Sequence, residues 1–296
     1  MVSVVLPTYE RADLVGRAVD SVLAQTFEDF ELVVVDDASR DDTPAVVRGY
    51  DDDRVTYVRH EVNRHVSAAR NTGIAHAGGR YVAFLDDDDE WLPTKLEKQV
   101  ALLEDSPDRV GLAYCWMDYV DGDEVVEAYR PTLRGEIFER ALAGQPIGGC
   151  STLLVRSGIV DEVDGFDEDL PRGNDGDFIR RVCRKYHVDY VPEVLVRYRV
   201  GHGSQRITRD DRAGIENAVR ANRAKLEKFA DDLRRYPSAR AAVLSTLGWR
   251  YGQLGDWPAS LTHFARAVRA DPAEPELYRN AARLVYHHTV GRFHDR

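Results

Sequence analysis

Two kinds of segment alternate over the first hundred residues. Short apolar runs at 3–7, 31–36, 55–58 and 81–85 have the length and composition of buried β-strands. Between these runs, apolar residues recur every three or four positions, which is typical of helices with one buried face. This order of strands and helices predicts an α/β domain around a largely parallel sheet.

Four helices are expected between and after these strands. The second has Pro44 in its first turn, and Gly78 and Gly79 are expected to end the third. The four helices are expected at 14–23, after Asp42, at 66–79 and at 93–104.

The pattern becomes looser from 111 to 200 and indicates an α+β region. We expect strands at 111–120 and 151–155, a helix at 173–186 and a pair of extended segments at 188–200. A polar, glycine-bearing loop then covers 201–212.

Everything after residue 212 has helical periodicity, and the composition shifts toward Ala, Arg and Leu. We therefore expect one domain at 1–212 and an all-α extension at 213–296. A stretch at about 241–274 has the residue spacing of one tetratricopeptide helix pair. Because one repeat cannot bury both of its faces, it should stack on the flanking helices and on the first domain. Two roles remain open, a helical cap and a surface for a protein partner. The residues with this spacing are Leu247, Gly248, Tyr251, Phe264, Ala267 and Pro272.

Charge and composition exclude several classes of protein. A net charge of −11 argues against nucleic acid as a partner, because a phosphate backbone requires a basic surface. The three cysteines are far apart, which argues against a disulfide framework and a zinc site. The sequence has no apolar run long enough to span a membrane, and its first residues, MVSVVLPTYE, have neither the basic start nor the long apolar core expected of a signal peptide. We expect a cytoplasmic protein, and contact with the cytoplasmic face of a membrane remains open.

Five carboxylates at 86–90 directly follow a predicted buried strand. In open α/β sheets, ligands bind beyond the carboxyl ends of the strands. If the segment is extended, Asp86 and Asp88 share one face, and two converging carboxylates suit Mg²⁺ or Mn²⁺ together with substrate phosphates. The alternative is a solvated acidic loop.

Other polar residues are expected at the same edge of the sheet. Some follow the first strand, where a backbone turn can approach a ligand. Two end the second strand, where a carboxylate can accept hydrogen bonds from a base or a ribose, and an arginine precedes the acidic strand. Each of them taken alone is more often a helix cap or an exposed side chain than part of a ligand site. They are Pro7, Thr8, Tyr9, Glu10, Arg11, Asp36, Asp37 and Arg70.

Three segments, at 2–43, 68–91 and 165–182, together resemble the successive sequence blocks of the family 2 glycosyltransferases, which have the GT-A fold. The similarity extends over residues 1 to about 205. It implies a Rossmann-like mixed sheet flanked by helices. It also implies an enzyme that transfers a sugar, with inversion, from a nucleotide-diphosphate donor to a hydroxyl of a glycan or a lipid-linked glycan. The resemblance favours a UDP-type donor and Mn²⁺ or Mg²⁺ as cofactor.

The resemblance also assigns roles to single residues. It places Pro7, Thr8, Tyr9, Glu10, Asp36 and Arg70 in the nucleoside pocket, and Asp86 and Asp87 against the ribose and diphosphate. Asp88 corresponds to the metal ligand, and Asp175 to the general base that takes the acceptor proton. Three positions depart from the family pattern: Glu10 replaces an asparagine, His65 a glycine and Asn174 a glutamate.

Two of these assignments have alternatives. Asp175 lies before an amphipathic helix, where aspartate is also a common N-cap. His202, in a glycine-flanked loop, either closes on the diphosphate or metal or is an exposed histidine.

Two other kinds of protein compete with the transferase hypothesis. A nucleotidyltransferase also uses paired aspartates, but it needs a glycine-rich basic loop after the first strand, and PTYERAD has neither feature. A helical-repeat adaptor with a degenerate transferase domain is the second alternative. The intact Asp86, Asp88 and Asp175 argue against degeneracy.

Overall fold

The computed structural model describes residues 1–200 and 211–289. Contacts divide these residues into two compact units. The first contains 1–137, 146–168 and 178–200, and the second contains 138–145, 169–177 and 211–289. The expected domain boundary at residue 212 stays a prediction.

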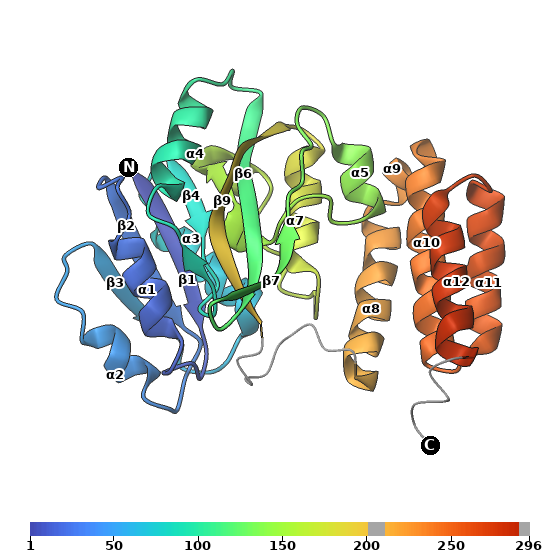
Figure 1. The fold of residues 1–296 in the computed structure, drawn as a ribbon, viewed down its shortest axis with the longest axis horizontal. Helices are drawn as coiled ribbons and strands as arrows, with labels where there is room; N and C mark the ends of the chain where they lie inside the picture. Colours follow the sequence, from blue (N-terminus) through green and yellow to red (C-terminus); the bar gives the residue numbers. More distant parts are fainter. Residues whose placement is uncertain (201–210, 290–296) are drawn as a thin grey trace. The chain divides into compact units, whose positions relative to one another are not determined.

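Nine strands in residues 1–200 form one sheet (Figure 1). Its order is β3-β2-β1-β4-β8-β6-β9-β5, with β7 paired to β6. The strands from β3 to β4 are parallel to their neighbours, whereas β8 is antiparallel to both β4 and β6. The predicted mixed sheet flanked by helices is confirmed. The strands are β1 Val2–Thr8, β2 Phe30–Asp36, β3 Val55–Arg59, β4 Tyr81–Phe84, β5 Glu90–Trp91, β6 Val110–Asp121, β7 Glu124–Tyr129, β8 Leu154–Arg156 and β9 His187–Val200.

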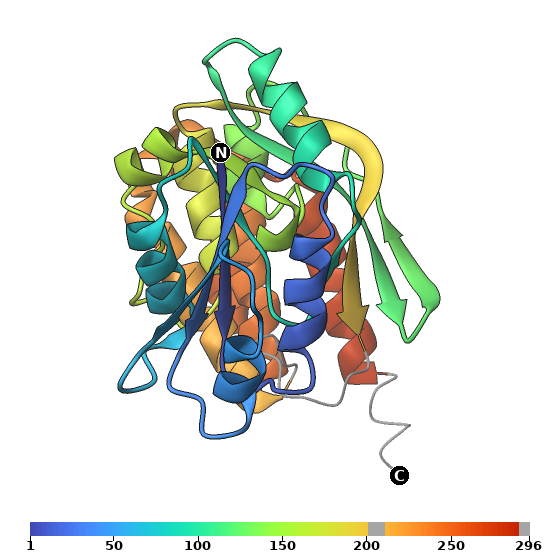
Figure 2. The ribbon, with the colours of Figure 1, turned by 90° about the vertical axis from the view of Figure 1, so that its left-hand side faces the viewer.

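Helices cover both faces of this sheet, because successive strand residues point to opposite sides (Figure 2). Leu32 and Val34 of β2 belong to the core cluster that includes α1, α2 and α4. Val33 and Val35 pack instead with Ala69 of α3. The helices are α1 Val15–Leu23, α2 Thr43–Arg48, α3 His65–His76, α4 Lys95–Glu104, α6 Ser157–Glu162 and α7 Asn174–Cys183. Of α7, the residues from Phe178 onward belong to this unit.

One glycine shows how closely α3 approaches the sheet. A Cβ atom at Gly73 would lie 2.3 Å from a methyl carbon of Val5. No real Cβ tolerates such a distance, so only glycine fits here without moving the helix away from β1.

The sequence predicted the first four strands and helices to within a few residues, but three of its expectations were wrong. The segment at 188–200 is one strand, β9, and not an extended pair. Residues 151–155 divide between a 3₁₀ turn at Cys150–Thr152 and β8. Helix α3 ends at His76, before the two glycines. All three differences are at element ends or irregularities, where hydrogen bonds to distant strands decide the conformation.

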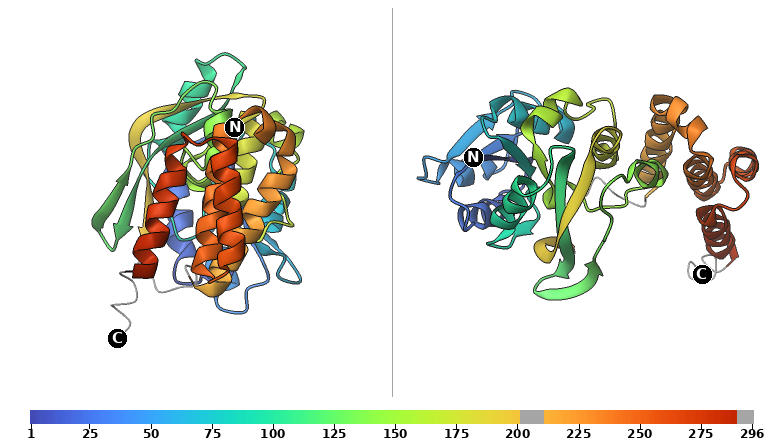
Figure 3. Two further views of the ribbon diagram at one scale, coloured as in Figure 1. Left: turned by 90° about the vertical axis from the view of Figure 1, so that its right-hand side faces the viewer. Right: turned by 90° about the horizontal axis from the view of Figure 1, so that it is seen from above.

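The second unit is helical (Figure 3). Helices α10 and α11 form a hairpin in which the Ser260 hydroxyl donates to the Gly248 carbonyl at 2.7 Å. A Cβ at Gly248 would lie 2.8 Å from the Phe264 ring. These contacts explain the small residues of the repeat-like pattern, and the expected helical extension is confirmed. The helices are α5 Phe138–Ala143, α8 Arg212–Lys228, α9 Ala230–Arg235, α10 Pro237–Gln253, α11 Trp257–Ala270 and α12 Pro275–Thr289.

None of the helices in the described parts of the chain combines the length and the apolar character that crossing a membrane requires.

Candidate active site

The acidic segment after β4 forms a tight turn and is not extended. The Asp89 N–H donates to the Asp86 carbonyl at 3.0 Å, which closes a β-turn with Asp87 and Asp88 at its centre. The expectation that Asp86 and Asp88 share one face of an extended segment was therefore wrong. Side chains in a turn diverge, so each carboxylate has its own surroundings.

Arginines from other elements compensate much of this charge. Arg70 of α3, which is almost fully buried, donates to Asp86 at 2.6 Å, and its guanidinium also lies 5.1 Å from the centre of the Phe166 ring. Arg11 lies 3.9 Å from Asp88. Glu90 pairs with Arg199 of β9 at 2.7 Å. Three of the five carboxylates thus face a guanidinium group.

The other two carboxylates hold their protons more tightly than usual. Burial and the charge of Asp88 raise the pKa of Asp87 to about 7. Burial and the same neighbouring charge raise the pKa of Asp89 well above its ordinary value. The Ser151 hydroxyl donates to Asp89 at 2.5 Å and accepts from the Asp86 N–H at 3.2 Å. Partial protonation and this serine therefore reduce the repulsion within the turn.

The loops after β1 and β2 are joined to each other at the same edge of the sheet. Three successive backbone N–H groups of the first loop donate to side chains of the second. Glu10 donates to Ser39 at 2.9 Å and Arg11 donates to Thr43 at 3.0 Å. Ala12 donates to Asp41 at 3.1 Å. The Pro7–Glu10 segment is consequently held in one conformation beside the acidic turn, since β1 lies between β2 and β4.

Asp36 is fully buried at the end of β2 and already accepts hydrogen bonds. Its carboxylate accepts from the Ser39 N–H at 2.8 Å and from the Tyr57 hydroxyl at 2.5 Å, and the Arg59 Nε lies 3.5 Å away. These contacts indicate that Asp36 organises the loop after β2. Its predicted contact with a nucleoside stays a prediction.

Two of the departures from the family pattern have unusual backbones. Glu10 has φ of 51° and His65 has φ of 67°, both in the left-handed region. Asparagine and glycine, the family residues at these positions, enter that region at lower cost than most other residues. The family preference at both positions therefore has a backbone cause.

Asp175 lies in the second unit, on the first turn of α7, where a negative charge interacts favourably with the helix dipole. Helix α7 begins at Asn174, so Asp175 is inside the helix and is not its N-cap. Asn174 is nearly buried and donates to the Leu170 carbonyl at 3.1 Å. Asp177 pairs with Lys228 at 2.9 Å. His202 lies outside the described residues.

The predicted metal fits this turn only in part. Among the described residues, no three or more His, Cys, Asp or Glu side chains gather in a way that could hold a metal ion. A Mg²⁺ or Mn²⁺ ion that uses one or two carboxylates and completes its shell with phosphates and water does not need such a cluster. Asp88 suits that role, since its side chain is 19% exposed. Asp86 suits it less well because Arg70 holds its carboxylate.

Sequence reasoning missed Ser151 and Arg199 as parts of this site. Ser151 is separated from Asp89 by 62 residues, and no local pattern connects them. Arg199 could have been suspected from the sequence, although the signal is weak. Arg197 and Arg199 are two residues apart in β9 and therefore lie on the same face of the strand.

The family model described as glycosyl transferase family 2 matches residues 3–153. The chain belongs to this family. The match contains the acidic turn, Arg70 and both loops beside the turn, and the resemblance inferred from the three sequence blocks is confirmed.

Two relatives are similar to this chain over different lengths. An uncharacterised glycosyltransferase of Rickettsia prowazekii is 31% identical over 211 residues, which cover 69% of this chain and 65% of the relative. The chain thus spans slightly less than two thirds of that relative's length. A UDP-Glc:α-D-GlcNAc-diphosphoundecaprenol β-1,3-glucosyltransferase, WfgD of Escherichia coli, is 38% identical over 103 residues, 35% of this chain and 41% of WfgD.

Solved structures share the fold over nearly the whole chain. TarS 1–349 of S. aureus superposes with a TM-score of 0.67 at 18% identity, covering 95% of this chain and 87% of TarS 1–349. The mannosyltransferase PcManGT of Pyrobaculum calidifontis, solved with GDP-Man and Mn²⁺, has a TM-score of 0.60 at 21% identity, covering 97% of this chain and 80% of that one.

Proposed function

We propose that this protein is a metal-dependent, inverting glycosyltransferase that uses a nucleotide-diphosphate sugar. The observation that carries the proposal is the acidic turn, with Arg70 and Arg11 facing Asp86 and Asp88, at the carboxyl edge of β1 and β4. Ligands of open α/β sheets bind at this edge. The turn also lies within the residues that match the family.

The site has the charges that a diphosphate and a cation would meet. Asp88 would hold Mn²⁺ or Mg²⁺, which, when bound, stabilises the negative charge that develops on the leaving diphosphate. Arg11 lies beside Asp88 and would orient phosphate oxygens through its guanidinium fork. Arg70 and Ser151 keep Asp86 and Asp89 in place while the ligand binds.

We propose Asp175 as the general base. An acceptor hydroxyl is a weak nucleophile, and a carboxylate that removes its proton during attack contributes about 10²- to 10⁴-fold to the rate. Asp175 is half-buried near the start of α7, which leaves its carboxylate accessible in part. In this proposal Asn174 replaces the negative charge of the usual glutamate with a neutral side chain that donates to Leu170.

The donor and acceptor classes are proposed from relatives. TarS 1–349 has also been solved with UDP-GlcNAc, and the name of WfgD specifies a UDP-glucose donor and a diphosphoundecaprenol-linked acceptor. We propose a UDP-sugar as donor and a glycan or lipid-linked glycan as acceptor.

Thermal unfolding with nucleotides tests this function. The midpoint is measured with UDP, GDP, ADP and CDP, each with and without Mn²⁺. A ligand that binds only the folded state at 100 times its dissociation constant stabilises it by about 2.7 kcal/mol. We expect a rise with UDP that depends on Mn²⁺. A midpoint that no nucleotide moves under either condition would contradict the proposal.

Three variants assign the roles. Asp88→Asn should remove the Mn²⁺ dependence of UDP binding. Asp175→Asn should leave UDP binding intact and lower kcat by about 10²-fold or more. Asp108→Asn changes an exposed aspartate in the turn after α4 and serves as the matched control with unchanged binding and rate.

A further inference from the structure

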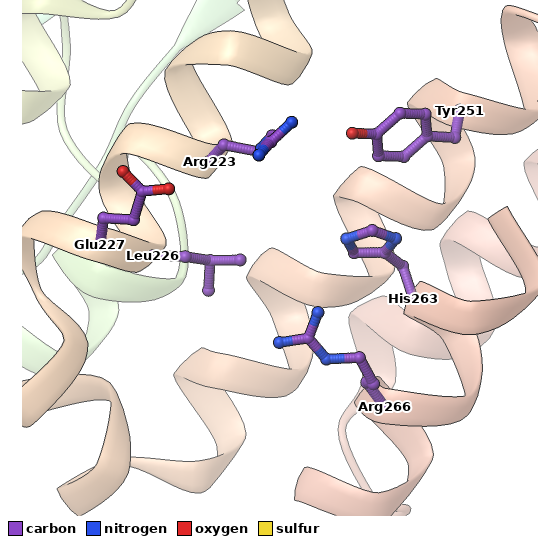
Figure 4. Close-up of a pocket in the computed structure, with 6 residues that line it drawn as sticks. All are labelled: Arg223, Leu226, Glu227, Tyr251, His263 and Arg266. Carbon is purple, nitrogen blue, oxygen red and sulfur yellow. The ribbon is translucent and has the colours of Figure 1, made fainter. Parts of the chain in front are cut away.

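The second unit contains a pocket of about 480 Å³ that the transferase chemistry does not use. Figure 4 shows that side chains of α8 face side chains of α10 and α11 across it. Its volume is within the range of small-molecule sites, about 300–1,000 Å³. The lining residues are Arg223, Leu226, Glu227, Tyr251, His263 and Arg266.

Arg223 and Arg266 bring positive charge into this pocket. Neither makes a hydrogen bond or an ion pair with another residue of the described chain. Other cations of α8 are paired: Arg212 lies 3.1 Å from Glu216, and Lys228 lies 2.9 Å from Asp177. In a protein with a net charge of −11, two guanidinium groups without a partner in one pocket favour an anionic ligand.

A stacked pair of aromatic rings lines one side of the pocket. The rings of Tyr251 and His263 stack at 5.0 Å with an angle of 29° between their planes. The His263 Nδ1 contacts the Ala259 carbonyl at 2.8 Å, which orients the ring. A sugar ring has apolar C–H groups that could contact this aromatic pair and Leu226, and its hydroxyls could donate to Glu227.

The pocket is short along the helices. Its residues cover 223–227 on α8 and 263–266 on α11. At 1.5 Å per residue these stretches are about 6 Å and 4.5 Å long. An extended peptide advances about 3.3 Å per residue, so only one or two of its residues would fit. The dimensions therefore favour a compact ligand over a peptide segment.

We propose that this pocket binds a phosphorylated sugar. The two guanidinium groups would hold the phosphate, for which the arginine fork has matching geometry. The side chains of Tyr251, His263 and Leu226 would contact the ring, and Glu227 would accept from hydroxyls. All six residues belong to the second unit, and none belongs to the donor site proposed above. The inference goes beyond the proposed function and does not depend on it.

Isothermal titration calorimetry of the full chain with glucose 1-phosphate tests the pocket. We expect binding that Arg223→Gln and Arg266→Gln each weaken about 10-fold or more, since each removes a charged hydrogen bond. Arg269→Gln is the matched control, because Arg269 is an exposed arginine of α11 outside the pocket, and it should bind as the unmodified protein does. Glucose and inorganic phosphate should each bind more weakly than glucose 1-phosphate.

Several outcomes would overturn the proposal. One is the absence of heat with glucose 1-phosphate at millimolar concentration. Another is binding that survives both arginine variants but is lost in Asp88→Asn, which would place the probe in the donor site. Inorganic phosphate that binds as tightly as glucose 1-phosphate would remove the role of the sugar. UDP binding with Mn²⁺, measured in parallel, should not change in Arg266→Gln, so failure of the pocket and failure of the donor site are distinguishable.

Discussion

The acidic turn of the first unit and the helical pocket of the second unit differ in whether their charged side chains have partners. In the turn, Arg70, Arg11 and Arg199 face three carboxylates, and raised pKa values favour the protonated forms of the other two. In the pocket, Arg223 and Arg266 have no partner among the described residues. This difference in pairing shows that charge density alone does not identify a binding site. A compensated site can exchange partners when a ligand arrives, whereas an uncompensated one attracts a ligand of opposite charge.

Arginine substitutions in the two regions give the largest expected contrast. Arg70→Gln removes the guanidinium group that pairs with Asp86 at 2.6 Å. We expect the free energy of unfolding to fall by about 3 kcal/mol, which is near the lower end for breaking a buried pair because Asp86 is partly exposed. Arg266→Gln should change it by less than about 0.5 kcal/mol. Urea unfolding at pH 7 measures both. Equal effects would mean that the two regions do not differ in this way.

Lys95 offers a second test of compensation in the first unit. This lysine is fully buried, with its Nζ 3.7 Å from the centre of the Trp91 ring and 3.5 Å from the Leu153 carbonyl. Burial lowers its pKa to about 7. Because a lysine in the unfolded chain keeps its proton up to about pH 10, the free energy of unfolding should rise between pH 7 and 10.

Lys95→Met removes this cost. We expect the variant to be more stable at pH 7 by about 2 kcal/mol, and its stability to rise less between pH 7 and 10 than that of the unmodified protein. Urea unfolding at pH 7, 8 and 9 measures the difference. Lys98→Met, on the same helix but in a surface pair with Glu193, is the control and should keep the original pH dependence. Parallel pH profiles for Lys95→Met and the unmodified protein would contradict the expectation.

Ser151 provides the hydroxyl that holds both ends of the acidic turn. Ser151→Ala leaves the buried Asp89 oxygen without its donor, and we expect a loss of about 1–2 kcal/mol in the free energy of unfolding. The control is Ser106→Ala, where the hydroxyl donates to the carbonyl of Leu102 one helical turn earlier. A smaller loss at Ser151 than at Ser106 would show that the turn does not depend on this serine.

His65→Gly is expected to have the smallest effect. Glycine relieves the cost of a positive φ but increases the entropy of the unfolded chain, so we expect a net stabilisation of about 0.5 kcal/mol. His76→Gly, near the end of the same helix, should destabilise by about 1 kcal/mol because glycine disfavours a helix. The midpoints of urea unfolding compare the two variants, and a change of the same sign in both would contradict the backbone explanation.

Most of the fold could be predicted because its signals are local. Apolar runs and helical spacing located β1 to β4 and α1 to α4, since each pattern depends on neighbours a few residues apart. Helices α5 and α6 and strands β5 and β7 were missed. Strand β7 has the sequence EVVEAY, which lacks the alternation of a half-buried strand; its residues are mostly exposed, and the strand is held by pairing with β6. The prediction of an extended pair at 188–200 was wrong because β9 continues through Pro192, with an irregular register against β6.

The sequence by itself determined the element types, the family and the position of the acidic segment, because periodicity and the order of the three blocks are properties of the chain. Only the tertiary structure decided which charges meet. Arg70 reaches Asp86 from 16 residues away, and Ser151 reaches Asp89 from 62 residues away. The pocket on α8, α10 and α11 likewise brings together residues from 223 to 266. The physical reason is that compensation and cavity shape depend on distances in space, which local sequence patterns do not encode.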